Sequence, residues 1–375
     1  MDVPTVNPPS SPARAAALRS RRDSAAKTHP HDPWAWKSFA DDFPRFRPAR
    51  WIGGAHAQTL GGVFLPYPRP TYRATRHQVV LDDGDRLILH DDCPKGWRHG
   101  RRTVLMIHGL TGSHRSGYME RTAAKLNARG IRTFRMDLRG CGAGAGLARF
   151  PYHSGRSDDA AAALREIARL CPDGPTTLVG FSLGGNIALK LLGELENRPC
   201  GGLDSGIAVC PPVDLSRCAN GIGRFPNSIY NRHFVKSLLK HVGKVTRHFQ
   251  ADAPMPKLPR TPKGIVEFDD LYTAPLGGFV DGETYYRECS GLRFLHAVGR
   301  PTLIMAAEND PMIPPFGLRG RASVGVGRFA LRPRRRTPGL HRPTRHRSRS
   351  ALDGLAFGRL DYTLGRIRRP LRRAA

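Results

Sequence analysis

A stretch of ten residues, Thr176 to Gly185, constrains the fold of this chain more than any other part of its sequence. It reads as a buried strand, a tight turn and the start of a helix, and its turn carries the pattern Gly180-x-Ser182-x-Gly184. A serine at the apex of such a turn has a strained backbone and points its hydroxyl out of the sheet. The glycines have no Cβ, so strand and helix can approach closely. We therefore predict that Ser182 is a catalytic nucleophile, the alternative being an ordinary Gly-Ser turn.

Apolar strands alternate with helices through much of the chain. Strands are expected at residues 77–81, 86–90, 103–107, 131–136, 176–179, 206–210 and 301–307, and helices at 118–128, 158–170 and 185–195. This alternation predicts an α/β fold, in which a mostly parallel sheet carries helices on both faces. Ligands bind such sheets at the carboxyl ends of the strands. His108, Asp137 and Ser182 all fall at such ends.

The alternation stops between residues 211 and about 298, where one or two helices are expected at 227–249. An insertion of this size between strands is usually a cap over an active site. The alternative is a set of helices that only pack outside the sheet. Residues 1–33 are rich in Pro, Ser and Arg and are predicted to be disordered, which leaves residues 34–316 for the domain.

A serine hydroxyl is a weak nucleophile, so it needs a base beside it and an acid that orients the base. In this architecture the chain order is serine, acid, histidine. Asp310 follows the strand after the insertion, and we predict that it is the acid. Glu308 is the alternative acid, and Asp310 could instead be a turn residue before Pro311.

The oxyanion that forms during acyl transfer needs two backbone amides. One is expected from Leu183, the residue after the nucleophile. The other is expected from Leu110, in the loop after the strand at 103–107. His108 is interpreted as the residue that orients this loop, with direct proton transfer as the alternative.

Several motifs resemble the YheT-like hydrolases, the AB hydrolase 4 branch of the α/β-hydrolase superfamily, over residues 45 to 316. They are His56-Ala57-Gln58-Thr59-Leu60, His108-Gly109-Leu110-Thr111-Gly112, Asp137-Leu138-Arg139-Gly140-Cys141, Tyr152-His153-Ser154-Gly155, Gly180-Phe181-Ser182-Leu183-Gly184-Gly185-Asn186, Glu267-Phe268-Asp269-Asp270 and Asn309-Asp310-Pro311. The resemblance implies an α/β-hydrolase fold, a Ser-Asp-His triad and no cofactor. It also implies hydrolysis of carboxylic esters with short or medium acyl chains, or of acylglycerol-like lipids. The animal relatives act on acylglycerols and phospholipids.

The chain departs from this resemblance at its end. The family closes with a Gly-Gly-His loop that carries the base, followed by a helix that contains Trp, and residues 317–375 have neither. They hold 17 Arg and two acidic residues, about half of the net charge of +29. We predict that this tail is read out of frame, because codons for Arg335 to Arg342, started one nucleotide later, permit Gly-Gly-His-Pro-Gly-Phe-Ile-Gly. The alternative is a true basic tail that binds nucleic acid or anionic lipid.

If the tail is correct as written, His341 and His346 are the residues that could replace the base. We name His341 as the substitute. A serine hydrolase without its base loses several orders of magnitude in rate. A catalytically dead family member, or a protein that binds through its basic tail, is therefore the alternative function.

The remaining composition excludes other classes of protein. The sequence has no apolar run of about 18 residues, so no membrane span is expected. Its seven cysteines form no CxxC pair, so neither a zinc site nor a disulfide framework is expected. The first residues lack the apolar core of a signal peptide, and we predict a cytoplasmic protein. The expected partner is a small ester or lipid, without specific nucleic acid; peripheral membrane contact and the oligomeric state stay open.

Overall fold

The computed structural model describes residues 52–64, 66–71, 73–249, 258–307, 310–313, 318 and 327–331. All of them belong to one compact unit, Ala40–Ala375, and a second unit, Met1–Phe39, lies outside the described residues. The predicted disordered segment 1–33 lies outside them too. No helix in the described ranges is both long and apolar enough to cross a bilayer.

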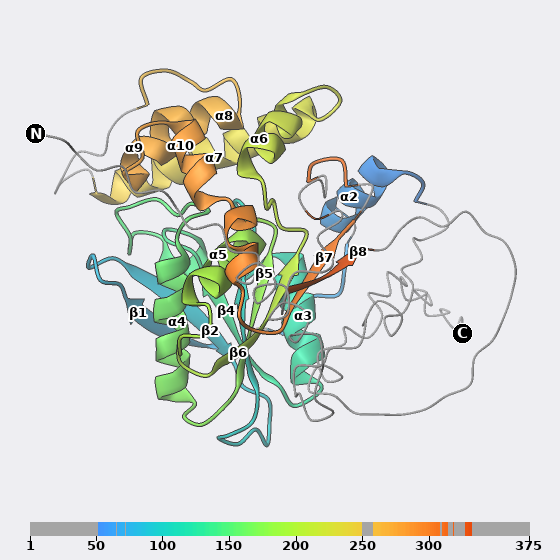
Figure 1. The fold of residues 1–375 in the computed structure, drawn as a ribbon, viewed down its shortest axis with the longest axis vertical. Helices are drawn as coiled ribbons and strands as arrows, with labels where there is room; N and C mark the ends of the chain where they lie inside the picture. Colours follow the sequence, from blue (N-terminus) through green and yellow to red (C-terminus); the bar gives the residue numbers. More distant parts are fainter. Residues whose placement is uncertain are drawn as a thin grey trace, which may run out of the picture. The chain divides into compact units, whose positions relative to one another are not determined.

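A sheet of eight strands forms the centre of the described part (Figure 1). The strands are β1 (Thr75–Val80), β2 (Arg86–Asp92), β3 (Thr103–Ile107), β4 (Arg132–Asp137), β5 (Thr176–Phe181), β6 (Leu203–Val209), β7 (Thr302–Ala306) and β8 (Gly327–Leu331). Their order across the sheet is β1-β2-β4-β3-β5-β6-β7-β8. β1 pairs antiparallel with β2 and β2 with β4, and every other pair is parallel. The predicted mostly parallel sheet is therefore confirmed.

Both faces of the sheet are covered by helices, as the alternation predicted. Alternate residues of β3 show this, because successive side chains of a strand point to opposite faces. Val104 packs in one cluster with residues of α3 (Gly117–Asn127), whereas Leu105 packs in another with residues of α4 (Ser157–Leu170) and α5 (Leu183–Leu195). All five residues of β3 are buried, which explains the continuous apolar run.

The segment between β6 and β7 is helical and gathers over one end of the sheet (Figure 1). It contains α6 (Leu215–Gly223), α7 (Ser228–Phe249), α8 (Ile265–Phe268), the π-helical turn η4 (Asp269–Thr273), α9 (Ala274–Gly277), α10 (Gly282–Cys289) and the 3₁₀ turns η5 (Gly291–Arg293) and η6 (Leu295–Ala297). Leu215, Val235, Ile265 and Tyr285 form part of a separate apolar cluster there. Within the described residues, the structure also has α2 (Ala55–Phe64) and the 3₁₀ turn η3 (Gly142–Gly144).

The strands expected from the sequence end at residue 307, and the structure adds one more after them, β8. β8 pairs parallel with β7, with Thr302 opposite Gly327 and Ala306 opposite Leu331. Leu318 is buried against an apolar cluster that includes Ile304. The edge of β7 offers backbone groups that need partners, and this part of the Arg-rich segment supplies them. Residues 332–375 lie outside the described residues, so the out-of-frame interpretation stays a prediction there.

Candidate active site

The strand, turn and helix predicted around Ser182 are all present. β5 ends at Phe181, α5 begins at Leu183, and Ser182 between them has φ 51° and ψ −119°. A residue other than glycine in this left-handed region stores about 1–3 kcal/mol of strain. Backbone bonds hold it there, since its amide donates to the carbonyl of Val209 at 2.8 Å and its carbonyl accepts from the amide of Gly185 at 2.8 Å.

Two glycines make this turn sterically feasible. A Cβ on Gly180 would lie 2.1 Å from the carbonyl oxygen of Gly184. A Cβ on Gly184 would lie 2.5 Å from the carbonyl oxygen of Ile107 and 2.6 Å from that of His108. These contacts are with backbone, which cannot easily move aside. The pattern Gly-x-Ser-x-Gly is thus explained by close packing on both sides of Ser182.

We expect Gly184→Ala to destabilise the fold by about 2–3 kcal/mol, because the new methyl group overpacks a rigid site. The matched control is Gly243→Ala, at an exposed position of helix α7 where a Cβ meets nothing within 4 Å. It should stabilise the protein by up to about 1 kcal/mol. Urea unfolding followed by circular dichroism measures both. Equal urea midpoints for the two variants would contradict the close packing of Gly184 against the backbone at the end of β3.

The loop after β3 lies against Ser182, since a Cβ on Gly109 would be 3.0 Å from the Cβ of Ser182. Among the described residues, no acceptor takes the amide of Leu110. The amides around it are all taken: Gly109 by the Tyr118 hydroxyl at 2.9 Å, Thr111 by the Tyr152 hydroxyl at 3.0 Å, and Gly112 by the Gly109 carbonyl at 3.0 Å. Leu183 is the first residue of α5, so its amide has no acceptor within the helix. These two amides are the ones predicted for the oxyanion.

His108 holds this loop in place. Its Nε2 accepts a hydrogen bond from the amide of Leu138 at 3.1 Å, so the proton sits on Nδ1, which donates to the carbonyl of Gly109 at 2.8 Å. The side chain is fully buried, and this burial lowers its pKa. A neutral imidazole with both nitrogens occupied orients the loop, and this geometry disfavours the alternative role in proton transfer.

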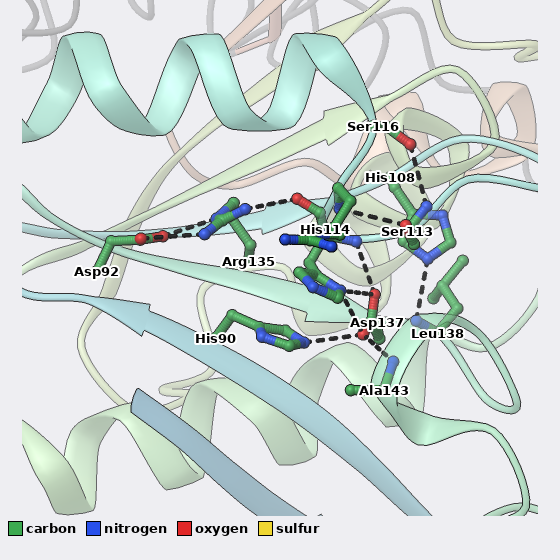
Figure 2. A network of polar contacts seen from close by, with 11 residues as sticks. His90, Asp92, His108, Ser113, His114, Ser116, Arg135, Asp137, Leu138 and Ala143 are labelled. Carbon is green, nitrogen blue, oxygen red and sulfur yellow. Dashed lines mark hydrogen bonds and ion pairs between the residues drawn. The ribbon is translucent and has the colours of Figure 1, made fainter. Parts of the chain in front are cut away.

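A second buried network ties the same loop to the sheet, as Figure 2 shows. The carboxylate of Asp137 accepts from the amides of His114 at 2.6 Å and Ala143 at 2.8 Å, and it binds the imidazoles of His90 and His114, each at 2.8 Å. Burial alone would raise the pKa of Asp137, but the hydrogen bonds from both histidines outweigh it and hold that pKa well below its usual range. The network therefore anchors an ionised carboxylate beneath the loop.

These three side chains also form the one group of potential metal ligands in the described part of the chain. One ligand atom from each of His90, His114 and Asp137 lies within 4.8 Å of the others. The two imidazole rings are stacked, with centroids 3.5 Å apart. A cation would replace hydrogen bonds that Asp137 already accepts. Sequence reasoning missed the two histidines. One lies in β2 and the other in the loop after β3, and no local pattern indicates that these segments meet at Asp137.

Asp310 follows β7 at the edge of the sheet where the parallel strands end, as Ser182 follows β5. Its Oδ1 accepts the amides of Met312 at 2.9 Å and Ile313 at 3.0 Å, and no described residue donates to Oδ2. Burial raises the pKa of Asp310. Cys210 directly follows β6. Burial raises the pKa of its thiol to about 11, and the nearby charge of Asp310 contributes to this increase. The half-buried carboxylate thus has one fixed oxygen and one that can accept a further hydrogen bond.

The alternative acid Glu308 and the substitute bases His341 and His346 lie outside the described residues. The hydroxyl of Ser182 has no hydrogen-bond partner among the residues that the structure describes.

An apolar cavity of about 120 Å³ opens beside Ser182. Leu110, Leu183, Met312 and Ile313 contribute to its wall from the sheet side. The segment between β6 and β7 covers the opposite side: Leu215, Cys218, Ala219, Ile222, Phe234, Leu238, His241, Ile265, Phe268, Asp269, Tyr272, Thr273, Tyr285 and Tyr286. This lining favours the predicted cap at 211–298, which stays a prediction.

The cavity contains polar groups that sequence reasoning did not assign. Burial lowers the pKa of His153 to about 3 and that of His241 to about 4, so both imidazoles are neutral near pH 7. The Nδ1 of His153 accepts the amide of Gly155, whereas the buried Nε2 of His241 has no partner among the described residues. The sequence signal for His241 was its place on the apolar face of a helix, three residues after Leu238.

A family model described as the α/β-hydrolase fold matches residues 102–322, more than half of the chain. The chain belongs to the α/β-hydrolase family. The putative esterase YheT of Escherichia coli (strain K12) is 30% identical to this α/β hydrolase over 275 residues, which are 72% of this chain and 78% of YheT. The resemblance to YheT-like hydrolases, expected from the motifs, is thereby confirmed.

Two eukaryotic relatives are more distant. The monoacylglycerol lipase of Saccharomyces cerevisiae is 23% identical over 260 residues, which are 67% of this chain and 56% of the lipase. The phospholipase ABHD3 of Mus musculus is 25% identical over 283 residues, which are 73% of this chain and 67% of that enzyme. This α/β hydrolase therefore spans little more than half the length of the yeast relative.

Proposed function

We propose that this α/β hydrolase cleaves carboxylic esters, with Ser182 as the nucleophile. The observation that carries the proposal is the strained turn that holds Ser182 against an apolar cavity. The lining suits the acyl chain of a short or medium ester or of an acylglycerol-like lipid. The relatives named esterase, monoacylglycerol lipase and phospholipase support this class of substrate.

The chemistry follows from the geometry. The hydroxyl of Ser182 attacks the acyl carbon, and the amides of Leu110 and Leu183 bind the oxyanion. A histidine accepts the serine proton and then donates it to the leaving alcohol. Asp310 supports the imidazolium through the oxygen that has no donor among the described residues. Water then attacks the acyl-enzyme by the same proton transfers and releases the acid.

The histidine is proposed to be encoded in the shifted frame of the tail. The family match ends at residue 322, before the Arg335 to Arg342 segment whose shifted codons permit Gly-Gly-His. If the tail is correct as written, His341 is the proposed substitute. The domain then comprises residues 34–316 with a cap at about 211–298, extended by β8.

The class of bond is tested with 4-nitrophenyl acetate, butyrate and octanoate, against 4-nitrophenyl phosphate and the 4-nitroanilide of butyric acid. We expect the protein with the restored frame to hydrolyse the three carboxylic esters at least about 100-fold faster than the phosphate or the anilide. Faster release from the phosphate would overturn the proposal, as would no release from any ester.

One buried carboxyl group in the cavity gives a prediction about pH. Asp269 accepts hydrogen bonds from the hydroxyls of Thr273 at 2.6 Å and Tyr286 at 2.7 Å. Burial raises its pKa from 3.8 to about 6. The folded state therefore binds more protons than the unfolded state between these values, so the stability contributed by Asp269 is complete below about pH 4 and is lost as the pH rises through 6.

We expect Asp269→Asn to remove this loss, which amounts to about 3 kcal/mol. The variant should gain stability relative to the parent as the pH rises from 4 to 7. Urea unfolding of both proteins at four pH values measures the difference. A difference in free energy of unfolding that does not change with pH would contradict the prediction.

A further inference from the structure

Helix α7 has an inner face that belongs to the core of the cap. Val235, Leu238, Val242 and Val245 are buried there, and Phe234 and Leu238 also line the cavity. These residues recur every three or four positions, which places them on one side of the helix. The inner face is therefore fully used in packing.

The outer face of α7 carries positive charge without any acidic residue, since the helix contains no Asp or Glu. The exposed Lys and Arg side chains of the helix are Arg232, Lys236, Lys240, Lys244 and Arg247. Their spacing of three or four residues puts them in one row. None of them forms an ion pair with a described residue. Isolated exposed cations are ordinary, but a row of five that pairs with no described acidic residue is suited to a partner with a dense negative charge.

The row begins beside two exposed apolar side chains. Phe225 is 92% exposed and Ile229 is 70% exposed. Ile229 lies three residues before Arg232, so it continues the row, and Phe225 lies just before the helix. Single exposed apolar residues are normal on protein surfaces. Together with the cations, however, they match a surface that has anionic groups above an apolar layer.

We propose that this face of α7, from Phe225 to Arg247, docks on a membrane that contains anionic phospholipids. The cations would meet the headgroups, and Phe225 and Ile229 would enter the apolar layer beneath. A nucleic acid would satisfy the charges but not the apolar side chains. The docking does not depend on catalysis, whereas its use in presenting a lipid ester to the neighbouring cavity rests on the proposed function.

The test uses the full chain and vesicles of phosphatidylcholine with 30% phosphatidylserine, with vesicles of phosphatidylcholine alone as reference. Each Lys or Arg near such a surface contributes about fivefold to binding. The triple variant Lys236→Gln, Lys240→Gln, Lys244→Gln should therefore lower the partition coefficient about 100-fold on the anionic vesicles, measured by cosedimentation. Little change is expected on the neutral vesicles.

The matched control is the triple variant Lys95→Gln, Arg98→Gln, Arg101→Gln. These exposed residues lie between β2 and β3, at the end of the sheet where the parallel strands begin, away from the cap. The control removes the same charge, and the Arg-rich tail is present in both variants. We expect the control to change binding less than threefold. Equal losses in the two triple variants would overturn the proposal, because the binding would then report net charge only.

The apolar part is tested by Ile229→Ser against Val80→Ser, since these side chains are 70% and 68% exposed. We expect Ile229→Ser to weaken vesicle binding about tenfold and Val80→Ser to have little effect. If the helix triple variant weakens binding to a 20-base-pair DNA duplex more than to anionic vesicles, the lipid assignment is wrong. Binding is measured without turnover, so a failure of docking and a failure of ester hydrolysis are separate results.

Discussion

Ser182→Ala should lower kcat/KM for 4-nitrophenyl butyrate about 10⁴-fold or more in the protein with the restored frame. In the proposed mechanism the hydroxyl of Ser182 forms the acyl-enzyme, and no other described residue that lines the cavity has such a strained turn. The two amides proposed for the oxyanion and the cavity remain in the variant, so a small residual rate is expected. Initial rates of 4-nitrophenol release measure the effect.

Ser154→Ala is the matched control for this experiment. Ser154 lines the same cavity, but it lies in the loop before α4 and not on a strand-to-helix turn. Its loss should change kcat/KM less than about threefold. A Ser182→Ala variant that keeps more than a tenth of the parent activity would show that another residue attacks the ester.

Restoring the reading frame should raise ester hydrolysis about 10⁴-fold over the chain as printed, because it would supply the triad base. One nucleotide is deleted from the gene between the codons of β8 and Arg335, so that the sequence of the described sheet is unchanged. Replacement of the histidine in the new Gly-Gly-His loop by alanine should remove the gain. This variant separates the effect of the base from any effect of the altered tail on stability.

His341→Ala in the chain as printed tests the alternative base. If His341 replaces the missing histidine, the variant loses activity and frame restoration brings little gain. We expect no effect of His341→Ala on the low rate of the printed chain. A gene whose shifted frame contains stop codons, or lacks the histidine codon, would rule out the frame interpretation.

Local patterns were sufficient for the elements around Ser182. β3 and β5 are buried on both faces, and apolar residues fill their centres. α7 is one helix because its apolar residues keep a single period over 22 positions. β2 extends two residues beyond the prediction. The two additional residues are Asp91 and Asp92, whose charges are neutralised across the sheet by Arg132 and Arg135 of β4.

The parts that could not be predicted depend on contacts between distant segments. His90, His114 and Asp137 are 47 residues apart at most, and nothing local indicates that they meet. β8 was missed because an Arg-rich segment has weak strand character, and it is ordered by pairing with β7. The π-helical turn that carries Asp269 follows from packing within the cap.

The nucleophile itself can be identified by covalent labelling. The protein with the restored frame is treated with an alkyl 4-nitrophenyl phosphonate, digested and mapped by mass spectrometry. We expect one phosphonyl group per chain, on the peptide that contains Ser182, and loss of ester hydrolysis in proportion to the labelling. Label on any other residue in the inactivated protein, or full ester hydrolysis after Ser182 is labelled, would contradict the assignment of Ser182 as the nucleophile.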